Sequence, residues 1–376
     1  MLIFITGLLC FMAFLKPRSK YLYVIIIFFL WLCMAGTYGN ADEDIYMSRY
    51  NNPNLWVSNT EFLYNSIMAF FRNIGCSYEL YKAIITLIQL LLISSTIKRY
   101  SIYPNLVLIS YFWFPFLLDI AQMRNALATA IMIFGIQFLI NDIESNNCDK
   151  KITKNEIKYI ICITMATLVH TATVGWILLL LAKRWKTKTV ILFTVTFNII
   201  VMICNSNWLL NVLTKINVNS RITAYLSIEY QNSEWRHYGT ALLIVFLTFT
   251  FSMTIYYYLK HINIKEELVT INVVLWKKIN IILLCVVSII IRYTGEVYRI
   301  QVGLSLINYM IITNCCSRFL GVKNNEIKLT KRDCTILGIL VLYVAISVWV
   351  LEVRYGVNET IFIPVFKNNR FIDMLF

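Results

Sequence analysis

Long, uninterrupted runs of apolar residues restrict what this chain can fold into more than any other feature. One run, VLISYFWFPFLL, covers residues 107–118, and another, IMIFGIQFLI, covers residues 131–140. A helix needs roughly 20 apolar residues to cross a bilayer, and only helices and closed barrels satisfy the backbone hydrogen bonds there. Because these runs are continuous rather than alternating, they indicate membrane-spanning helices and not the strands of a barrel.

Composition supports this interpretation for the whole chain. Only 14% of the 376 residues are charged and 59% are hydrophobic, whereas a soluble domain has about 25% charged residues. We therefore predict an all-α, polytopic integral membrane protein that forms a single domain over residues 1–376. About twelve spans are predicted, at residues 2–15, 21–37, 78–97, 103–118, 123–141, 156–170, 172–183, 189–206, 239–259, 279–293, 300–317 and 335–351. The first of these lacks the cleavage site of a removable signal and is expected to be a retained helix.

The net charge of +14 is distributed in a way that indicates membrane topology. Basic residues concentrate in alternate predicted loops, among them residues 16–20 and 183–188. Cytoplasmic loops carry an excess of Lys and Arg, so this pattern places both termini on the external side. The basicity is thereby explained without nucleic acid, and no nucleic-acid partner is expected.

Two motif classes are missing from the sequence. The ten cysteines include no CxxC pair and no cluster with histidine, and only Cys76 lies in a predicted external loop. A disulfide framework and a structural metal are therefore not expected. The loops also contain no GxxxxGK[ST] phosphate-binding motif, so ATP-driven activity of this chain alone is disfavoured. No metal and no cofactor are predicted.

Two long external segments, residues 38–77 and 207–238, are expected to contribute to a substrate chamber. Within the first, NTEFLYNSIMAFFRNIG has apolar residues at helical spacing and predicts an amphipathic helix on the outer membrane surface. The second becomes polar and rich in aromatic residues after residue 220. Aromatic faces next to polar side chains would suit sugars.

Ionisable residues gather at the predicted external turns. A charge within a membrane helix costs about 2.5–3.5 kcal/mol and usually faces a cavity. Because four separate turns deliver such groups to one side, we predict a polar chamber that opens to the outside. The groups are Asp42, Glu43 and Asp44 after the second span, Asp119 and Arg124, His170, and Arg292, Glu296 and Arg299.

Each of these residues also has a structural interpretation. Asp119 and Arg124 would form an interfacial ion pair, and His170 would be a hydrogen-bonding residue at a tight turn. The acidic residues after the second span would be a solvated cap. All of these residues are predicted at the same side and depth of the membrane. This coincidence favours a shared functional site over a separate structural role for each residue.

The chemistry of the predicted chamber suits group transfer from a lipid diphosphate to a hydroxyl. Guanidinium groups bind phosphates bidentately, and histidine takes a proton near pH 7. Arginines would stabilise the departing pyrophosphate, and a base would deprotonate the acceptor. The candidate phosphate ligands are Arg124, Arg292 and Arg299, and the candidate catalytic groups are His170, Asp42, Asp44 and Asp119.

Four segments resemble the EpsG-type family of bacterial polysaccharide polymerases, which is related in role to the Wzy O-antigen polymerases. They are GTYGNADEDIYMSRY (36–50), DIAQMRNALA (119–128), VHTATVGW (169–176) and RIQVGLSLINY (299–309). The second is the most specific. The first departs from the family pattern, because Gly39 and Asn40 stand where an acid is more usual, and this leaves Asp42 and Asp44 as the candidate carboxylates.

The resemblance implies a metal-independent, lipid-donor glycosyltransferase with GT-C-like architecture in the bacterial inner membrane. Such proteins link oligosaccharide repeat units, carried on undecaprenyl diphosphate, into O-antigen, capsule or exopolysaccharide at the outer face of that membrane. By position, Arg124 would be a diphosphate ligand assisted by Arg299 and Arg292, and His170 a base or acceptor-orienting residue. Membrane lipid and a chain-length regulator protein are the further partners considered.

Two other functions remain open from the sequence. A flippase would also have about twelve spans, but transporters place charges at the membrane midplane on helices broken by Gly and Pro. Here the polar groups are predicted at the external side, and the chain has five prolines. Another membrane transferase, such as a ligase or an acyltransferase, is the second alternative. The distribution of charge favours the polymerase.

Overall fold

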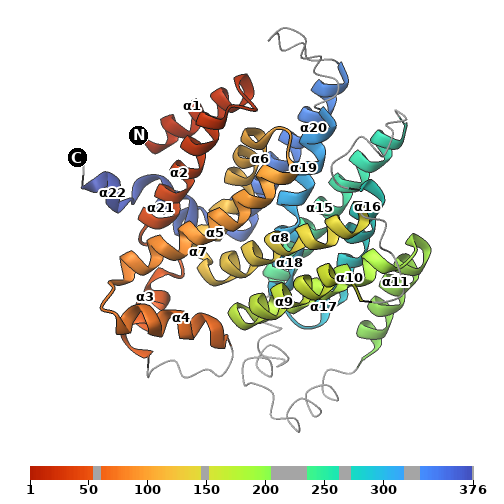
Figure 1. The fold of residues 1–376 in the computed structure, drawn as a ribbon, viewed down its shortest axis with the longest axis horizontal. Coiled ribbons are helices and arrows are strands. Elements are labelled where there is room, and N and C mark those ends of the chain that lie inside the picture. Colours follow the sequence, from red (N-terminus) through yellow and green to blue (C-terminus); the bar gives the residue numbers. More distant parts are fainter. Residues whose placement is uncertain (54–60, 145–151, 205–234, 262–271, 317–330, 375–376) are drawn as a thin grey trace.

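The structure is a computed structural model that describes residues 1–376 except 54–60, 145–151, 205–234, 262–271, 317–330 and 375–376. Within these ranges the chain is built from helices (Figure 1), and Thr37 and Asn369 form an isolated antiparallel bridge. The predicted all-α fold class is therefore confirmed. Most of the predicted external segment 207–238 and part of 38–77 lie outside the described residues.

The helices of eight or more residues are α1 Leu2–Leu15, α2 Lys20–Gly36, α3 Glu43–Asn51, α4 Phe62–Asn73, α5 Tyr78–Tyr100, α6 Pro104–Tyr111, α8 Met123–Glu144, α9 Lys154–Val169, α11 Thr187–Ile203, α15 Trp235–His261, α16 Val273–Ile282, α19 Ser305–Cys316 and α20 Lys331–Trp349. The shorter ones are η2 Phe112–Phe116, α7 Leu117–Ala121, η3 Thr171–Ile177, α10 Leu178–Arg184, η5 Leu283–Cys285, α17 Val286–Arg292, η6 Gly295–Val297, α18 Tyr298–Gly303, η7 Val350–Tyr355, η8 Asn358–Phe362, α21 Ile363–Lys367 and α22 Arg370–Asp373.

All twelve predicted spans coincide over most of their length with helical residues. Six stretches of the described chain are long and apolar enough to cross a membrane, and α1, α2 and α11 are shorter apolar helices. The six stretches are Tyr78–Tyr100, Pro104–Ala121, Met123–Asn141, Tyr238–His261, Val273–Arg292 and Asp333–Glu352. A polytopic membrane protein is thus supported, while the count of twelve spans, the external termini and the GT-C-like architecture stay predictions.

Helix starts follow local sequence signals. Ser19 and Ser77 cap α2 and α5 by accepting hydrogen bonds from backbone amides three residues later, which satisfies N–H groups that have no partner inside the helix. Thr153 and Glu156 form a reciprocal capping box at the start of α9. Pro104 occupies the first turn of α6, where its missing N–H costs nothing.

Long-range packing forms one layered bundle around central helices. Helix α5 packs between α2 and α8, and α8 in turn packs against α9 (Figure 1). On the other side, α15 contacts α16, α18 and α20, and α11 contacts α16 and α17. Every residue of α19 is buried, and so is every residue of α7. The α7–α8 junction therefore lies inside the bundle rather than at its periphery.

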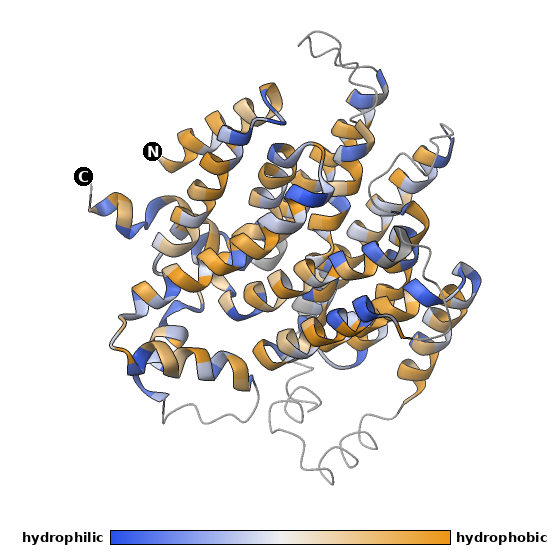
Figure 2. Cartoon of the chain, in the orientation of Figure 1, coloured by the Kyte–Doolittle hydropathy of each residue, from blue (hydrophilic) through white to orange (hydrophobic). Residues whose placement is uncertain are grey.

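Outer helices present apolar side chains to their surroundings. On α11, Leu192 and Ile203 are exposed while Val190 and Thr194 are buried. Figure 2 shows hydrophobic residues along most helices, with hydrophilic residues mainly toward helix ends and connections. An exposed apolar surface of this extent is stable in lipid but not in water. The colour pattern fits a protein whose solvent is largely the bilayer.

Between α2 and α5, two short helices form a separate pair, α3 and α4 (Figure 1). The amphipathic helix predicted from NTEFLYNSIMAFFRNIG is confirmed as α4, with Tyr64 and Met68 buried and Phe62 and Phe70 exposed. Helix α4 packs its buried face against α9, α5 and α3. Its position on the membrane surface stays a prediction.

Candidate functional site

The DIAQMRNALA segment crosses the junction between α7 and α8. The backbone leaves helical geometry at Gln122 (φ −103°, ψ 56°), so Asp119 lies at the end of one helix and Arg124 at the start of the next. The Tyr111 hydroxyl donates to Oδ2 of the buried Asp119 at 2.7 Å. The guanidinium of Arg124 forms its ion pair with Glu61 instead. The interfacial Asp119–Arg124 ion pair considered from the sequence is therefore not the contact that Arg124 makes.

Glu61 joins two of the predicted site residues. It directly precedes α4, and its side chain is 7% exposed. Its Oε2 forms the ion pair with Nη1 of Arg124, and its Oε1 lies 2.9 Å from Nδ1 of His170. His170 ends α9, so three separate elements, α4, α8 and α9, meet at one carboxylate.

The protonation state of Glu61 determines which nitrogen of His170 carries the proton. Burial alone would raise its pKa, but the hydrogen bond from His170 and the charge of Arg124 outweigh burial and lower the pKa of Glu61 to about 2. Glu61 is therefore an ionised carboxylate near neutral pH and can only accept hydrogen bonds. Nδ1 of His170 must then be the donor, which leaves Nε2 as the atom that can take a proton.

Helix α3 supplies an aromatic wall beside Arg124. The guanidinium carbon lies 5.4 Å from the ring centroid of Tyr46, and Nε of Arg124 lies 3.5 Å from its hydroxyl. Tyr46 packs edge-on against Tyr64 of α4, with the ring centroids 6.3 Å apart. A guanidinium over an aromatic face keeps its orientation and its charge when it is buried. Tyr46 belongs to the GTYGNADEDIYMSRY segment and was not predicted as a site residue.

Asp42 and Arg299 lie near this group. Burial raises the pKa of Asp42, and the charge of Glu296 acts in the same direction, against the opposing charges of Arg299 and Arg124. These charges act on Asp42 because the groups are close in space, although they come from distant segments. Arg299 itself forms an ion pair with Glu296, one helical turn earlier. Asp42, Arg124 and Arg299 are thus brought into one region.

A small cavity connects Arg299 to the α7–α8 junction. Asp119, Asn125 and Arg299 all line it, together with apolar side chains. Gly303 also lines it, and a Cβ at this position would lie 2.8 Å from the side chain of Trp176 in η3. Only glycine allows α18 and η3 to approach so closely. This approach places Arg299 and the segment after His170 on neighbouring elements.

Two predicted site residues have other surroundings. Asp44 is exposed on α3. Arg292 donates from Nη2 to the carbonyl oxygen of Cys204, just after the end of α11, at 3.1 Å. The described contact of Arg292 is therefore with the end of α11. Asp42, Asp119, Arg124, His170 and Arg299 are the predicted residues that the structure gathers.

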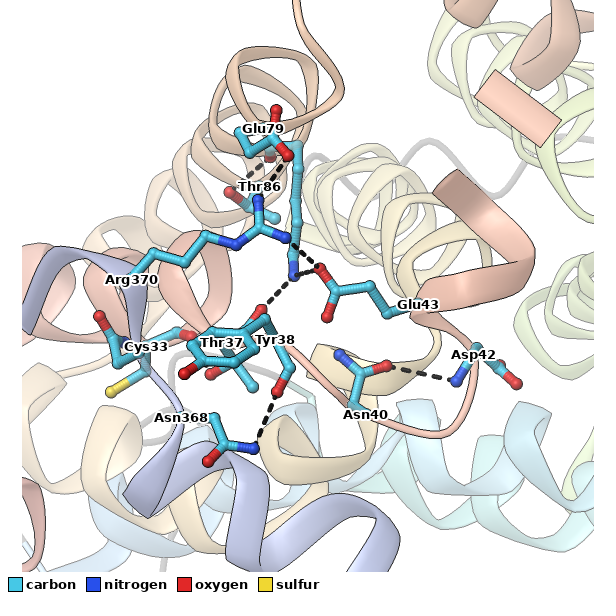
Figure 3. Close-up of polar contacts among 12 residues, drawn as sticks. Cys33, Thr37, Tyr38, Asn40, Asp42, Glu43, Glu79, Thr86, Asn368 and Arg370 are labelled. Carbon is cyan, nitrogen blue, oxygen red and sulfur yellow. Dashed lines mark hydrogen bonds and ion pairs between the residues drawn. The ribbon is translucent and has the colours of Figure 1, made fainter. Parts of the chain in front are cut away.

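A second set of charged residues holds the segment between α2 and α3 in place (Figure 3). This segment carries Asp42. Buried Glu43 lies 3.1 Å from Nζ of Lys82 on α5 and 3.7 Å from Nη2 of Arg370 near the C-terminus. Arg370 also pairs with Glu79 at 2.6 Å. The Tyr38 amide donates to the carbonyl of the C-terminal segment at residue 368, at 3.2 Å. Elements more than 300 residues apart thus hold the Asp42 segment in place.

Sequence reasoning missed Glu61, which connects the site. It appeared as an isolated acid before an amphipathic helix, a position where acidic residues commonly interact with the helix N-terminus. The available signal was that Glu61 is a carboxylate in the same predicted external segment as Asp42. Within the described ranges, no three His, Cys, Asp or Glu side chains gather as metal ligands, and metal independence stays a prediction.

The arrangement places guanidinium groups and an imidazole around carboxylates. Arg124 contacts Glu61, Arg299 contacts Glu296, and Nδ1 of His170 lies against Glu61. Guanidinium groups are of the kind that binds phosphate oxygens. Comparison with known proteins gave one finding: the model of the EpsG family matches residues 20–362. Neither the curated proteins nor the solved structures gave a match.

Proposed function

This chain belongs to the EpsG family, and from that premise we propose that it polymerises lipid-linked oligosaccharide repeat units. Membership makes it a membrane protein of polysaccharide biosynthesis. In the proposed reaction, the growing glycan leaves its undecaprenyl diphosphate carrier and joins the next lipid-linked unit. The donor, the direction of transfer and the outer face of the bacterial inner membrane as its location are parts of the proposal.

One observation supports this proposal above the others. The carboxylate of Glu61 contacts both Arg124 and His170, residues that the sequence proposes as phosphate ligand and base. A transferase that acts on a lipid diphosphate requires an anion-binding group and a base at the same reacting centre. The three side chains come from different elements, so their convergence is a property of the fold.

In the proposed step, a sugar hydroxyl of the acceptor attacks the anomeric carbon of the donor. The new glycosidic C–O bond forms as the bond from that carbon to the phosphate oxygen breaks. Nε2 of His170 takes the hydroxyl proton, because Nδ1 is held by Glu61. The diphosphate leaves with the electron pair of the broken bond, and a single displacement of this kind inverts the anomeric carbon.

The remaining residues have separate parts in the proposal. Arg299 binds the departing diphosphate, and Arg124 contributes through the guanidinium nitrogens that do not face Glu61. Asp42 and Asp119 line the polar region and accept hydrogen bonds from sugar hydroxyls. Asp44 and Arg292 have no part in it, since Asp44 is exposed and Arg292 donates to the Cys204 carbonyl.

Deletion of the gene followed by gel electrophoresis of the surface glycan tests the function. Without a polymerase, cells should keep a single repeat unit on each carrier or acceptor, because synthesis and flipping of the unit continue. Loss of all surface glycan would instead identify a transporter and overturn the proposal.

Purified protein given lipid-linked repeat units provides the biochemical arm of the test. It should produce longer glycans in the presence of a metal chelator, since the proposed step uses side chains of this chain alone. Strict dependence on added divalent metal would contradict the metal-independent mechanism.

A further inference from the structure

Carboxylates lie among the arginines of the site. Asp42, Glu61 and Glu296 lie close to Arg124 or Arg299, and Asp119 lines the small cavity beside Arg299. A diphosphate carries more than one negative charge, and each carboxylate near it repels it. A carboxylate that leaves its arginine as the ligand enters removes part of this repulsion.

Glu61 is poorly suited to move. Its side chain is 7% exposed and it is bonded to both Arg124 and His170. Withdrawing this largely buried carboxylate would break its contacts with Arg124 and His170 together, and breaking an ion pair in a protein interior is strongly unfavourable. It would also release the ring of His170. Glu61 therefore stays in place as the ligand enters.

Glu296 is well suited to move. Its side chain is 33% exposed, and it pairs with Arg299 within a single turn of the chain. The backbone at Glu296 is secured separately, because its amide donates to the hydroxyl of Thr294 at 3.2 Å. Rotation of the side chain alone can therefore carry the carboxylate toward solvent. Partly exposed ion pairs contribute little to stability, so this rotation costs little.

We propose that Glu296 occupies, in the ligand-free protein, the place on Arg299 that the diphosphate of the lipid donor takes. Binding exchanges a carboxylate for a phosphate on one guanidinium. Phosphate oxygens, like carboxylate oxygens, bind guanidinium bidentately, and a diphosphate brings more than one negative charge to Arg299. After transfer, Glu296 returns to Arg299 and helps to displace the diphosphate product. This inference rests on the proposed function, because it takes a diphosphate as the ligand.

Equilibrium binding of inorganic pyrophosphate and of farnesyl diphosphate to purified protein, in a chelator and at constant ionic strength, tests the exchange. Glu296→Gln should bind both probes roughly fivefold more tightly than the unchanged protein, which corresponds to removing one partly exposed ion pair. Glu296→Ala should behave in the same way. Glu359→Gln, at an exposed position of η8, serves as the matched control and should bind as the unchanged protein does.

A double variant identifies the partner. In Arg299→Gln the affinity should fall, and adding Glu296→Gln to it should give no further gain, because no guanidinium remains to be freed. Unchanged or weaker binding by Glu296→Gln overturns the exchange and makes Glu296 a residue that orients Arg299.

The two levels of the proposal fail differently. If the unchanged protein binds the probes and Arg299→Gln does not, while Glu296→Gln equals the unchanged protein, the exchange alone is wrong. If no variant binds either probe, the diphosphate site of the proposed function is wrong as well.

Discussion

The carboxylate of Glu61 lies 2.9 Å from Nδ1 of His170, although 109 positions separate the two residues in the chain. Because Glu61 is ionised, the imidazole must donate from Nδ1 and present Nε2 to the opposite side. Carboxylate–histidine pairs of this kind set the tautomer of a general base in hydrolases and metal enzymes. The same carboxylate holds Arg124, so the proposed base and the proposed anion ligand contact a single carboxylate.

Replacement of Glu61 tests this shared contact. Glu61→Gln removes the charge that orients His170 and Arg124 while keeping the size of the side chain. The rate of polymerisation should fall by roughly 10–100-fold, the usual effect of losing an orienting partner. The measurement is the rate of glycan elongation by purified protein, with Glu359→Gln as the control. An elongation rate equal to that of the control would show that Glu61 has no orienting role.

Replacement of the proposed base has a larger expected effect. His170→Gln should lower the rate by roughly 10²–10⁴-fold, the range of general base catalysis. In cells this variant should show the single-unit glycan pattern while remaining in the membrane. His261→Gln at the end of α15 makes the same chemical change far from the site and should give a normal ladder. A normal glycan ladder from His170→Gln would show that His170 is not the base.

The arginines should differ in their tolerance of lysine. Lysine keeps the charge but not the planar, bidentate donors, so Arg124→Lys and Arg299→Lys should both shorten the glycan ladder. Arg292→Lys should leave it near normal, because Arg292 donates to the carbonyl of Cys204. Ladder lengths are compared at equal membrane abundance. A severe effect confined to Arg292→Lys would reverse the assignment of the diphosphate ligands.

The stability of the folded protein at acid pH should depend on the ion pairs of Glu61. A carboxyl group whose pKa is lowered on folding stabilises the protein above its unfolded pKa, and this stability disappears as pH falls through the folded pKa. For Glu61, a lowering from 4.5 to about 2 corresponds to roughly 3 kcal/mol, lost between about pH 4.5 and pH 2. Over this range the detergent-solubilised protein should lose more thermal stability than Glu61→Gln. Parallel pH curves for the two proteins would show that the ion pairs add no stability.

The charges around Glu43 should contribute to stability as a set. Lys82→Met leaves Glu43 buried beside Arg370 alone, and breaking a buried ion pair in this way costs about 3–5 kcal/mol. The double variant Glu43→Gln, Lys82→Met should recover much of that loss, because neither charge then remains unpaired. Thermal unfolding of the purified variants measures both effects. Equal unfolding temperatures for the single and double variants would contradict the coupling.

Much of the helical architecture was predictable from local signals. The apolar runs became helices, and local helix-start residues stand at their N-terminal ends, as do Ser77, Thr153 and Pro104. The periodicity of residues 59–75 correctly predicted α4. These features depend on interactions within a few residues, which the sequence displays directly. Whether each helix can cross the membrane depends also on its length and apolar composition, and six stretches of the described chain meet both conditions.

The partners of the site residues depended on tertiary packing. Arg124 and Asp119 are five positions apart, yet the turn at Gln122 separates them, and Arg124 pairs with Glu61 while Asp119 accepts from Tyr111. The sequence by itself determined which side chains can carry charge and which stretches prefer lipid. Only the packing of α4 against α9 decided that Glu61 meets His170, because a contact across 109 residues arises from how helices associate rather than from local periodicity.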